Sequence, residues 1–259
     1  MESMLKRWLI LSYGLMAYLL FIVTMAYGVA FFGNLFVGRT IDAAATVPMG
    51  RALTVNVGLL LVFGLQHSGM ARPRFKSWLS RYIDPAAQRS TFVLASSITM
   101  IIMMVLWQPL GGVTWSIENP VAKQIILVVY FLGWMAMLWA TFLLDHLEMF
   151  GLRQAWCAFR DRRNCPEPVF QTPAAYRFLR HPIYAGWLII IWASPIMTIS
   201  HLVLAVGLTI YVLCGIQLEE RDLEKHLPYY EQYRRKVPML LPSLRRRLTG
   251  QASASETHR

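Results

Sequence analysis

Five long runs without a charged side chain divide this sequence, and they constrain the fold more than any other feature. The runs are 8–38, 52–71, 90–117, 124–144 and 181–218. A run of about 20 apolar residues is enough for one helix to cross a membrane. Only 15% of the 259 residues are charged, against about a quarter in a typical soluble domain. The chain is therefore predicted to be an all-α, multi-pass integral membrane protein.

The last of these runs, 181–218, is about twice as long as one span needs to be. Pro195 and Ser200 lie near its middle. We expect a tight hairpin of two shortish helices, 184–199 and 201–221. Together with the four earlier runs this gives about six transmembrane segments. A form with five spans also fits, in which one arm of the hairpin is re-entrant or a short helix.

Basic residues are distributed unevenly among the connecting segments. Arginine and lysine gather in 71–90, 149–180 and the C-terminal tail, whereas 39–51, 111–120 and the turn of the hairpin carry few. The positive-inside rule places the basic segments in the cytoplasm. Both termini are then cytoplasmic. Because this topology accounts for the net charge of +11, no nucleic-acid partner is predicted.

Polar clusters fall at four of the predicted cytoplasmic helix ends. They are Gln66-His67, Asp145-His146, the stretch from Arg180 to Gly186, and Glu219-Glu220. Ionisable groups at membrane depth are costly and tend to mark functional cavities. One such cluster alone is more often a helix end that reaches the lipid headgroups. Four clusters on the same side favour a shared site.

The stretch from Arg180 to Gly186 is specific as a whole, although no single residue in it is. Pro182 suits the first turn of a helix. Backbone N–H groups exposed there can bind a ligand, and Gly186 would permit its close approach. Acids near the C-terminal end of a helix oppose the helix dipole, so Glu219 and Glu220 need a compensating cation. An arginine of the chain or the positive charge of S-adenosylmethionine could serve.

Asp145 and His146 combine an acid with a base, since histidine can take up a proton near neutral pH. Adjacent residues of a helix do not face each other, so we expect one of the two to pair with His67 or Gln66. An isolated His146 would more often be structural. Because His146 lies near the other predicted clusters, we give a structural and a catalytic role for it equal weight. No cluster has the spacing of a metal site, and none is predicted.

The C-terminal third resembles the signature of the isoprenylcysteine carboxyl methyltransferase superfamily. The matching residues are Arg180-His181-Pro182-x-Tyr184-x-Gly186, Glu219-Glu220, Tyr229, Tyr233, Val237-Pro238 and Leu241-Pro242. The signature covers 176–242 and implies S-adenosylmethionine binding at the cytoplasmic face. By this resemblance the cofactor contacts are His181, Tyr184, Glu219 and Glu220, supported by Arg180, Tyr229, Tyr233 and Arg234.

Motifs in the earlier spans indicate a more specific family within this superfamily. Gln66-His67-Ser68-x-Met70-Ala71-Arg72 and Asp145-His146-x-Glu148-x-Phe150-Gly151-Leu152 resemble segments of the bacterial membrane methanethiol S-methyltransferases and, more distantly, of NnrU-like proteins. This implies a bacterial inner-membrane enzyme that converts methanethiol and S-adenosylmethionine to dimethyl sulfide and S-adenosylhomocysteine.

A base is required for this reaction because a thiolate, not a thiol, is the nucleophile. We assign the base to His146, with Asp145 and His67 tuning it or relaying the proton. Gln66 would position the sulfur of the acceptor. The expected partners are this small thiol and the lipid bilayer, and no obligate protein partner is evident.

The chain is expected to form one polytopic domain over residues 1–259. The N-terminal spans cover 1–110, a methyltransferase core covers 121–242, and 243–259 is a flexible basic tail. Two other functions remain open. A carboxyl methyltransferase of the isoprenylcysteine type needs no base, which leaves the histidines unexplained. A non-enzymatic, NnrU-like haem-binding protein would use His67 and His146 as axial ligands.

Overall fold

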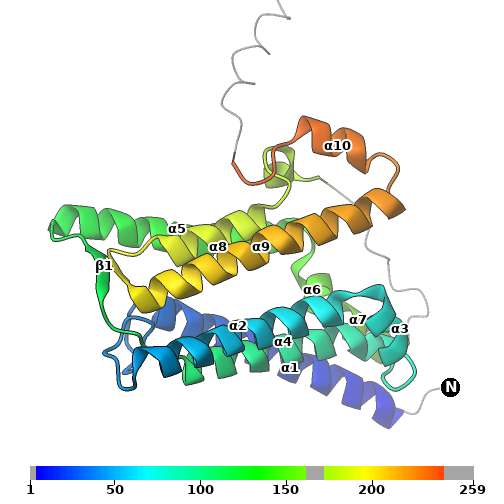
Figure 1. The fold of residues 1–259 in the computed structure, drawn as a ribbon. Coiled ribbons are helices and arrows are strands. Elements are labelled where there is room, and N and C mark those ends of the chain that lie inside the picture. Colours follow the sequence, from blue (N-terminus) through cyan, green and yellow to red (C-terminus); the bar gives the residue numbers. More distant parts are fainter. Residues whose placement is uncertain (1–3, 162–171, 242–259) are drawn as a thin grey trace, which may run out of the picture.

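The computed structural model describes residues 4–161 and 172–241, so the expected tail over 243–259 lies outside the described residues (Figure 1). The elements in chain order are α1 (Met4–Phe32), α2 (Met49–Ala71), α3 (Pro73–Leu79), α4 (Pro85–Leu106), β1 (Val113–Ser116), α5 (Pro120–Leu143), α6 (His146–Met149), α7 (Leu152–Phe159), η1 (Ala174–Arg177), α8 (Pro182–Trp192), β2 (Ile196–Thr198), α9 (Ile199–His226) and α10 (Tyr230–Lys236). Among the described residues, α1, α2, α4, α5 and α9 are long and apolar enough to cross a membrane. The prediction of a helical multi-pass membrane protein is confirmed.

The predicted hairpin is present, but its first arm is short. α8 has 11 residues, which extend about 16 Å at the usual helical rise, roughly half of the hydrocarbon core. The expected arm 184–199 is therefore wrong at its C-terminal end. Pro195 cannot continue the hydrogen-bond ladder and disfavours helical backbone in the preceding residue. β2 follows and pairs antiparallel with β1. The structure thus has the predicted form with five long spans and one short helix.

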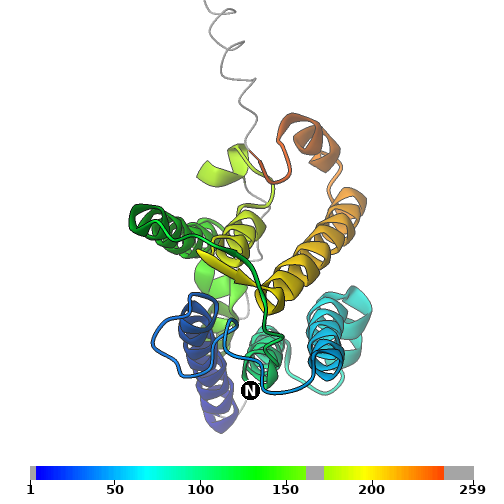
Figure 2. The ribbon, with the colours of Figure 1, turned by 60° about the vertical axis from the view of Figure 1, so that its left-hand side comes forward.

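Two groups of helices make up the bundle. α8 packs along α5, α9 contacts both α8 and α2, and α4 lies between α1 and α2 (Figures 1 and 2). The paired strands mark one end of the bundle, whereas α3, α6, α7 and α10 lie toward the other (Figure 1). The helix ends that were predicted to be cytoplasmic point toward this second end.

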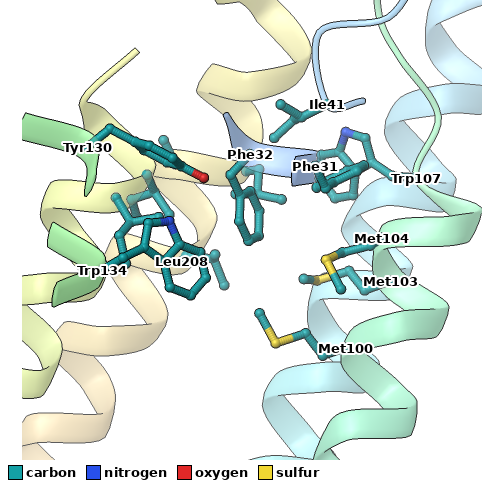
Figure 3. Close-up of a cluster of buried hydrophobic side chains, with 14 of the residues drawn as sticks. Phe31, Phe32, Ile41, Met100, Met103, Met104, Trp107, Tyr130, Trp134 and Leu208 are labelled. Atoms are coloured by element: carbon teal, nitrogen blue, oxygen red, sulfur yellow. The ribbon is translucent and has the colours of Figure 1, made fainter. Parts of the chain in front are cut away.

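The apolar core gathers in the half of the bundle nearer the strands, and Figure 3 shows its aromatic and methionine side chains in close-up. Phe31, Phe32, Trp107 and Tyr130 are at most 1% exposed. Between lipid-embedded helices, close van der Waals packing supplies the attraction that the hydrophobic effect supplies in water. The polar clusters predicted from the sequence lie in the opposite half of the molecule.

A buried Asp–His pair ties the strand-bearing end together. Nδ1 of His201 lies 3.0 Å from Oδ2 of Asp42, and Oδ1 of Asp42 accepts a hydrogen bond from the Thr198 hydroxyl at 2.5 Å. Nε2 of His201 lies 3.0 Å from the carbonyl oxygen of Ile191. Both ring nitrogens of His201 therefore face hydrogen-bond acceptors, one on the loop after α1 and one at the end of α8. The sequence carried no signal for this pair.

Candidate active site

Glu220 is the centre of the best-connected polar cluster. Its side chain is 2% exposed, and Oε1 accepts a hydrogen bond from Arg180 Nε at 2.7 Å and lies 2.9 Å from His181 Nε2. Oε2 lies 3.2 Å from Arg234 Nε. That oxygen is buried and accepts no hydrogen bond from any described residue. Arg180 and Arg234 are thus the cations that offset the carboxylate near the end of α9.

Arg180 also joins the start of α8 to the end of α10. Its Nη1 donates to the carbonyl oxygens of Arg234 at 2.8 Å and Val237 at 2.6 Å. A cation at this position complements the dipole of α10. The backbone N–H groups of Arg180 and His181 donate to the carbonyl oxygens of the two residues after Val237. The C-terminal part of the motif is therefore bound directly to its first part.

Glu219 and Glu220 face different surroundings, because neighbouring residues of a helix point about 100° apart. Glu219 is exposed, and its Oε2 accepts a hydrogen bond from the Tyr184 hydroxyl at 2.9 Å. The Tyr184 ring stacks against the ring of His181, with centroids 5.5 Å apart. His181 and Tyr184, from the first turn of α8, thus hold one glutamate each.

Gly186 faces helix α5. A Cβ atom at this position would lie 2.8 Å from Met137 Cβ and 3.0 Å from the carbonyl oxygen of Gly133. Small residues allow membrane helices to approach closely. The close approach that Gly186 permits in this structure is that of α5, and its contact with a ligand stays a prediction.

Of the tyrosines at and within α10, one is exposed and the others lie toward the interior. Tyr229 is 52% exposed at the start of the helix. The Tyr233 hydroxyl donates to the carbonyl oxygen of Tyr176 at 2.6 Å, and burial raises the pKa of Tyr233 to about 12, so this donor keeps its proton. Tyr230, which the motif did not single out, is 1% exposed. Tyr233 therefore holds α10 against η1.

A cavity of about 570 Å³ adjoins this cluster, within the size range of small-molecule sites. It is lined by Arg180, Glu224, Leu227, Pro228, Glu231, Arg234 and Arg235. Guanidinium and carboxylate groups both line the cavity. It therefore presents charge of both signs, as binding of a zwitterionic ligand requires.

His146 belongs to a second cluster and is only 4% exposed. Its Nδ1 lies 2.8 Å from Thr141 Oγ1, and its Nε2 lies 2.8 Å from the Tyr18 hydroxyl. The imidazole stacks on the ring of Phe142, with centroids 4.3 Å apart. Burial lowers the pKa of His146, and the charge of Asp145 only partly opposes this. The imidazole is therefore neutral near pH 7.

The predicted pairing of Asp145 or His146 with span two is absent. Asp145 has a left-handed backbone with φ of 83°, caps α6 through its side chain and forms an ion pair with Arg153. Among the described residues, no hydrogen bond or ion pair joins Asp145 or His146 to Gln66 or His67. The two clusters lie on helices that do not pack together, because α2 packs on α4 and α9 while α6 contacts α5 and α7.

Gln66 and His67 form a third cluster, with α4. Oε1 of Gln66 accepts a hydrogen bond from the Thr99 hydroxyl at 2.8 Å, and Nδ1 of His67 lies 3.2 Å from Ser96 Oγ. The ring of His67 also packs against Tyr211 of α9, with centroids 6.3 Å apart. Through Tyr211 this cluster borders the helix that carries the two glutamates.

The haem-binding alternative needs two facing histidines with a nitrogen of each available to the iron. Both ring nitrogens of His146 are engaged by side chains of the protein, and His67 lies in a different cluster. The described residues also contain no group of three or more His, Cys, Asp or Glu side chains placed to hold a metal ion. The arrangement of the histidines does not fit axial ligation.

Similarity to known proteins extends over nearly the whole chain. It is 44% identical over 242 residues to the methanethiol S-methyltransferase of Crocosphaera subtropica, which covers 93% of this chain and 94% of that protein. Identity to the methanethiol S-methyltransferase of Mycobacterium tuberculosis is 42% over 239 residues, with 92% and 98% covered. Nurim of Sus scrofa is 32% identical over 192 residues, or 70% of each chain.

No protein-family model and no solved structure matches the chain. The long alignments nevertheless confirm the resemblance that the motifs of the earlier spans indicated. The chain belongs to the methanethiol S-methyltransferase family.

Proposed function

We propose that this protein transfers the methyl group of S-adenosylmethionine to methanethiol, giving dimethyl sulfide and S-adenosylhomocysteine. The observation that carries the proposal is the near full-length similarity to proteins named methanethiol S-methyltransferase. A fold alone does not determine function, so the site must fit as well. The reaction needs a binding place for a charged cofactor and a base for the thiol, and the polar clusters offer both.

The cluster around Glu220 fits the cofactor by charge. It holds a buried carboxylate oxygen that accepts no hydrogen bond within the described part of the chain, and it adjoins a cavity lined by both cations and anions. Arg180 and Arg234 would bind the carboxylate of the cofactor, and Glu219 and Glu224 would bind its positively charged groups. When bound, S-adenosylmethionine supplies a methyl group on a positively charged sulfur, open to in-line displacement.

The other residues of the motif support this binding. His181 and Tyr184 fix the orientations of the two glutamates through contacts of 2.9 Å each. Tyr233 holds α10 beside the cavity. Tyr229, at the exposed start of α10, would cover a bound cofactor. Gly186 acts indirectly, since it sets the distance between α8 and α5.

His146 is the proposed base for the acceptor. It is neutral near pH 7 and can take a proton from a thiol, and the charge of Asp145 tunes its pKa upward. Met137, which contacts Gly186, lies one helical turn before Thr141, the partner of His146. The second cluster thus lies along α5 close to the start of α8. Gln66 and His67 are proposed to line the acceptor side from α2.

We place this site at the cytoplasmic face of a bacterial inner membrane, because the basic segments lie at that end of the spans. Residues 121–242 would form the cofactor-binding core, and spans within 1–110 would select the acceptor. Methanethiol is small and apolar, so it can reach the site through the bilayer.

The test is direct detection of the product. Membranes that contain the protein are supplied with methanethiol and methyl-labelled S-adenosylmethionine, and the headspace is analysed for labelled dimethyl sulfide. We expect dimethyl sulfide and S-adenosylhomocysteine in equal amounts, and none with membranes that lack the protein. Protein that binds the cofactor but forms no dimethyl sulfide would refute the thiol acceptor. Methyl-ester formation on a prenylated cysteine peptide would instead support the carboxyl methyltransferase.

A further inference from the structure

We infer that the Tyr18 hydroxyl is a catalytic group, which accepts the proton of the thiol while it passes its own proton to His146. The inference rests on the proposed S-methyl transfer and on His146 as its base. It concerns a residue of α1 that lies within an uncharged run and belongs to none of the motifs of the sequence.

The hydrogen-bond pattern locates the proton on His146. The Thr141 hydroxyl donates its single proton to the carbonyl oxygen of Leu138 at 2.6 Å. Thr141 Oγ1 can therefore only accept from Nδ1 of His146, 2.8 Å away. A neutral imidazole carries one proton, so Nε2 holds the free lone pair. That lone pair accepts the Tyr18 O–H at 2.8 Å.

Other approaches to this lone pair are closed. The imidazole is 4% exposed, and Phe142 stacks on it at 4.3 Å with an interplanar angle of 8°. Phe150 packs against it at 4.7 Å. Since Nδ1 faces Thr141, the Tyr18 oxygen is the one hydrogen-bond partner of Nε2 among residues 4–161 and 172–241, and a proton reaches Nε2 from it. If His146 is the base, Tyr18 must be the group that delivers the proton.

The same geometry serves both protonation states of His146. After proton uptake, Nε2–H donates to the Tyr18 oxygen, and Nδ1–H still donates to Thr141. Only the hydroxyl hydrogen of Tyr18 changes direction, so no hydrogen bond is lost. The aromatic faces of Phe142 and Phe150 favour the cationic ring.

Tyr18 lies where an apolar thiol can arrive. Its side chain is half-buried, whereas Leu15 and Ile22, one turn before and after it, are 47% and 43% exposed. In the membrane these leucine and isoleucine side chains face lipid. A small thiol dissolved in the bilayer therefore meets the hydroxyl of Tyr18 before it can meet the ring of His146.

The proposed step is balanced. The S–H bond of the thiol breaks as the Tyr18 oxygen takes its proton, and the original Tyr18 O–H bond breaks as that proton moves to Nε2 of His146. The sulfur electron pair of the thiolate forms the new S–C bond, while the bond between the methyl group and its former sulfur breaks. His146 then returns one proton to solvent by the reverse path.

The test compares Tyr18→Phe with a matched control, Tyr13→Phe. Tyr13 lies on the same helix, and its hydroxyl donates to Thr91 at 3.0 Å without contact to His146. Each variant is assayed at one pH with thiols of decreasing pKa, beside cofactor affinity and thermal stability. With methanethiol we expect kcat of Tyr18→Phe to fall at least about 100-fold, the usual lower size of a general-base effect. With thiols already ionised at that pH, kcat should be near wild type.

An equal loss of kcat for all thiols would assign Tyr18 a structural role and overturn the inference, as would full activity of Tyr18→Phe with methanethiol. Should that variant fail to fold, 3-fluorotyrosine at position 18 keeps the size and the hydroxyl but makes it more acidic. Its kcat must then change with methanethiol and not with ionised thiols. A wild-type protein that methylates no thiol would instead refute the proposed function itself.

Discussion

At the scale of single residues, the adjacent glutamates have separable roles. Glu220 is buried and held by Arg180 and His181, whereas Glu219 is exposed and accepts one hydrogen bond from Tyr184. Removing one partner from a buried ion pair destabilises a protein by about 3–5 kcal/mol. Replacement of Glu220 thus changes the fold as well as any bound ligand. Replacement of Glu219 tests ligand binding alone.

We expect Glu219→Gln to weaken S-adenosylmethionine binding about tenfold, equivalent to about 1.4 kcal/mol, without a change in melting temperature. Glu220→Gln should lower both the affinity and the melting temperature. Calorimetric titration and thermal unfolding measure the two quantities. Glu118→Gln removes an exposed carboxylate at the strand-bearing end, where it accepts from Ser116, and serves as control. Unchanged affinity in Glu219→Gln would remove this residue from the cofactor site.

At the scale of elements, α8 is the piece that connects the clusters. Its first residues bind the glutamates of α9, and Gly186 sets it against α5, which leads into the cluster of His146. Being too short to cross the membrane by itself, α8 depends on these neighbours for its position. Its packing on α5 therefore decides how the cofactor motif lies relative to the proposed base.

Gly186→Ala should lower the stability by about 1–3 kcal/mol, because overpacking forces backbone or side chains apart. The added methyl group would lie 2.8 Å from Met137 Cβ. Gly215→Ala is the matched control: beyond the local backbone of α9, no atom of the described residues lies within 4 Å of its added Cβ. Alanine also favours a helix over glycine by about 0.5–1 kcal/mol. Thermal unfolding in detergent measures both. Equal melting temperatures would contradict the tight α5–α8 contact.

At the scale of the whole molecule, the buried Asp42–His201 pair joins distant parts of the chain. Asp42 lies between α1 and α2, His201 is in the first turn of α9, and Thr198 belongs to β2. Burial alone would raise the pKa of Asp42, but the hydrogen bonds and charge of His201, with Thr198 and Asn34, lower it overall. The carboxylate form of Asp42 therefore stabilises the folded state.

The sign of the pH dependence follows from this lowered pKa. The contribution of Asp42 is complete above its unfolded pKa of about 3.9 and is lost as the pH falls through its folded value. The melting temperature of the wild type should therefore drop in acid below about pH 4. Asp42→Asn should be less stable at pH 7 by about 3–5 kcal/mol and show less of this acid dependence. An identical acid profile in both proteins would exclude the pair as a stabilising contact.

The transmembrane plan could be read from the sequence because the bilayer imposes it. A helix must bury about 20 apolar residues to cross, so the uncharged runs locate α1, α2, α4, α5 and α9 directly. The length of α8 could not be read in this way. Its run was apolar throughout, and the helix gives way at Pro195 to a strand whose partner, β1, lies far away in the sequence.

For the candidate site, too, the sequence determined one part and the tertiary structure the other. The cofactor-site prediction for Arg180, His181 and Glu220 came from the resemblance of their motif to a family signature, which the sequence alone displays. Which side chains meet was decided only by tertiary packing. His146 pairs with Tyr18 rather than His67 because α6 packs on α5 and α7, and α7 in turn packs against α1, which carries Tyr18. Periodicity identifies the type of a helix and not its neighbours. Tyr18 is one of three tyrosines in α1, and only the tertiary structure shows that its hydroxyl meets His146.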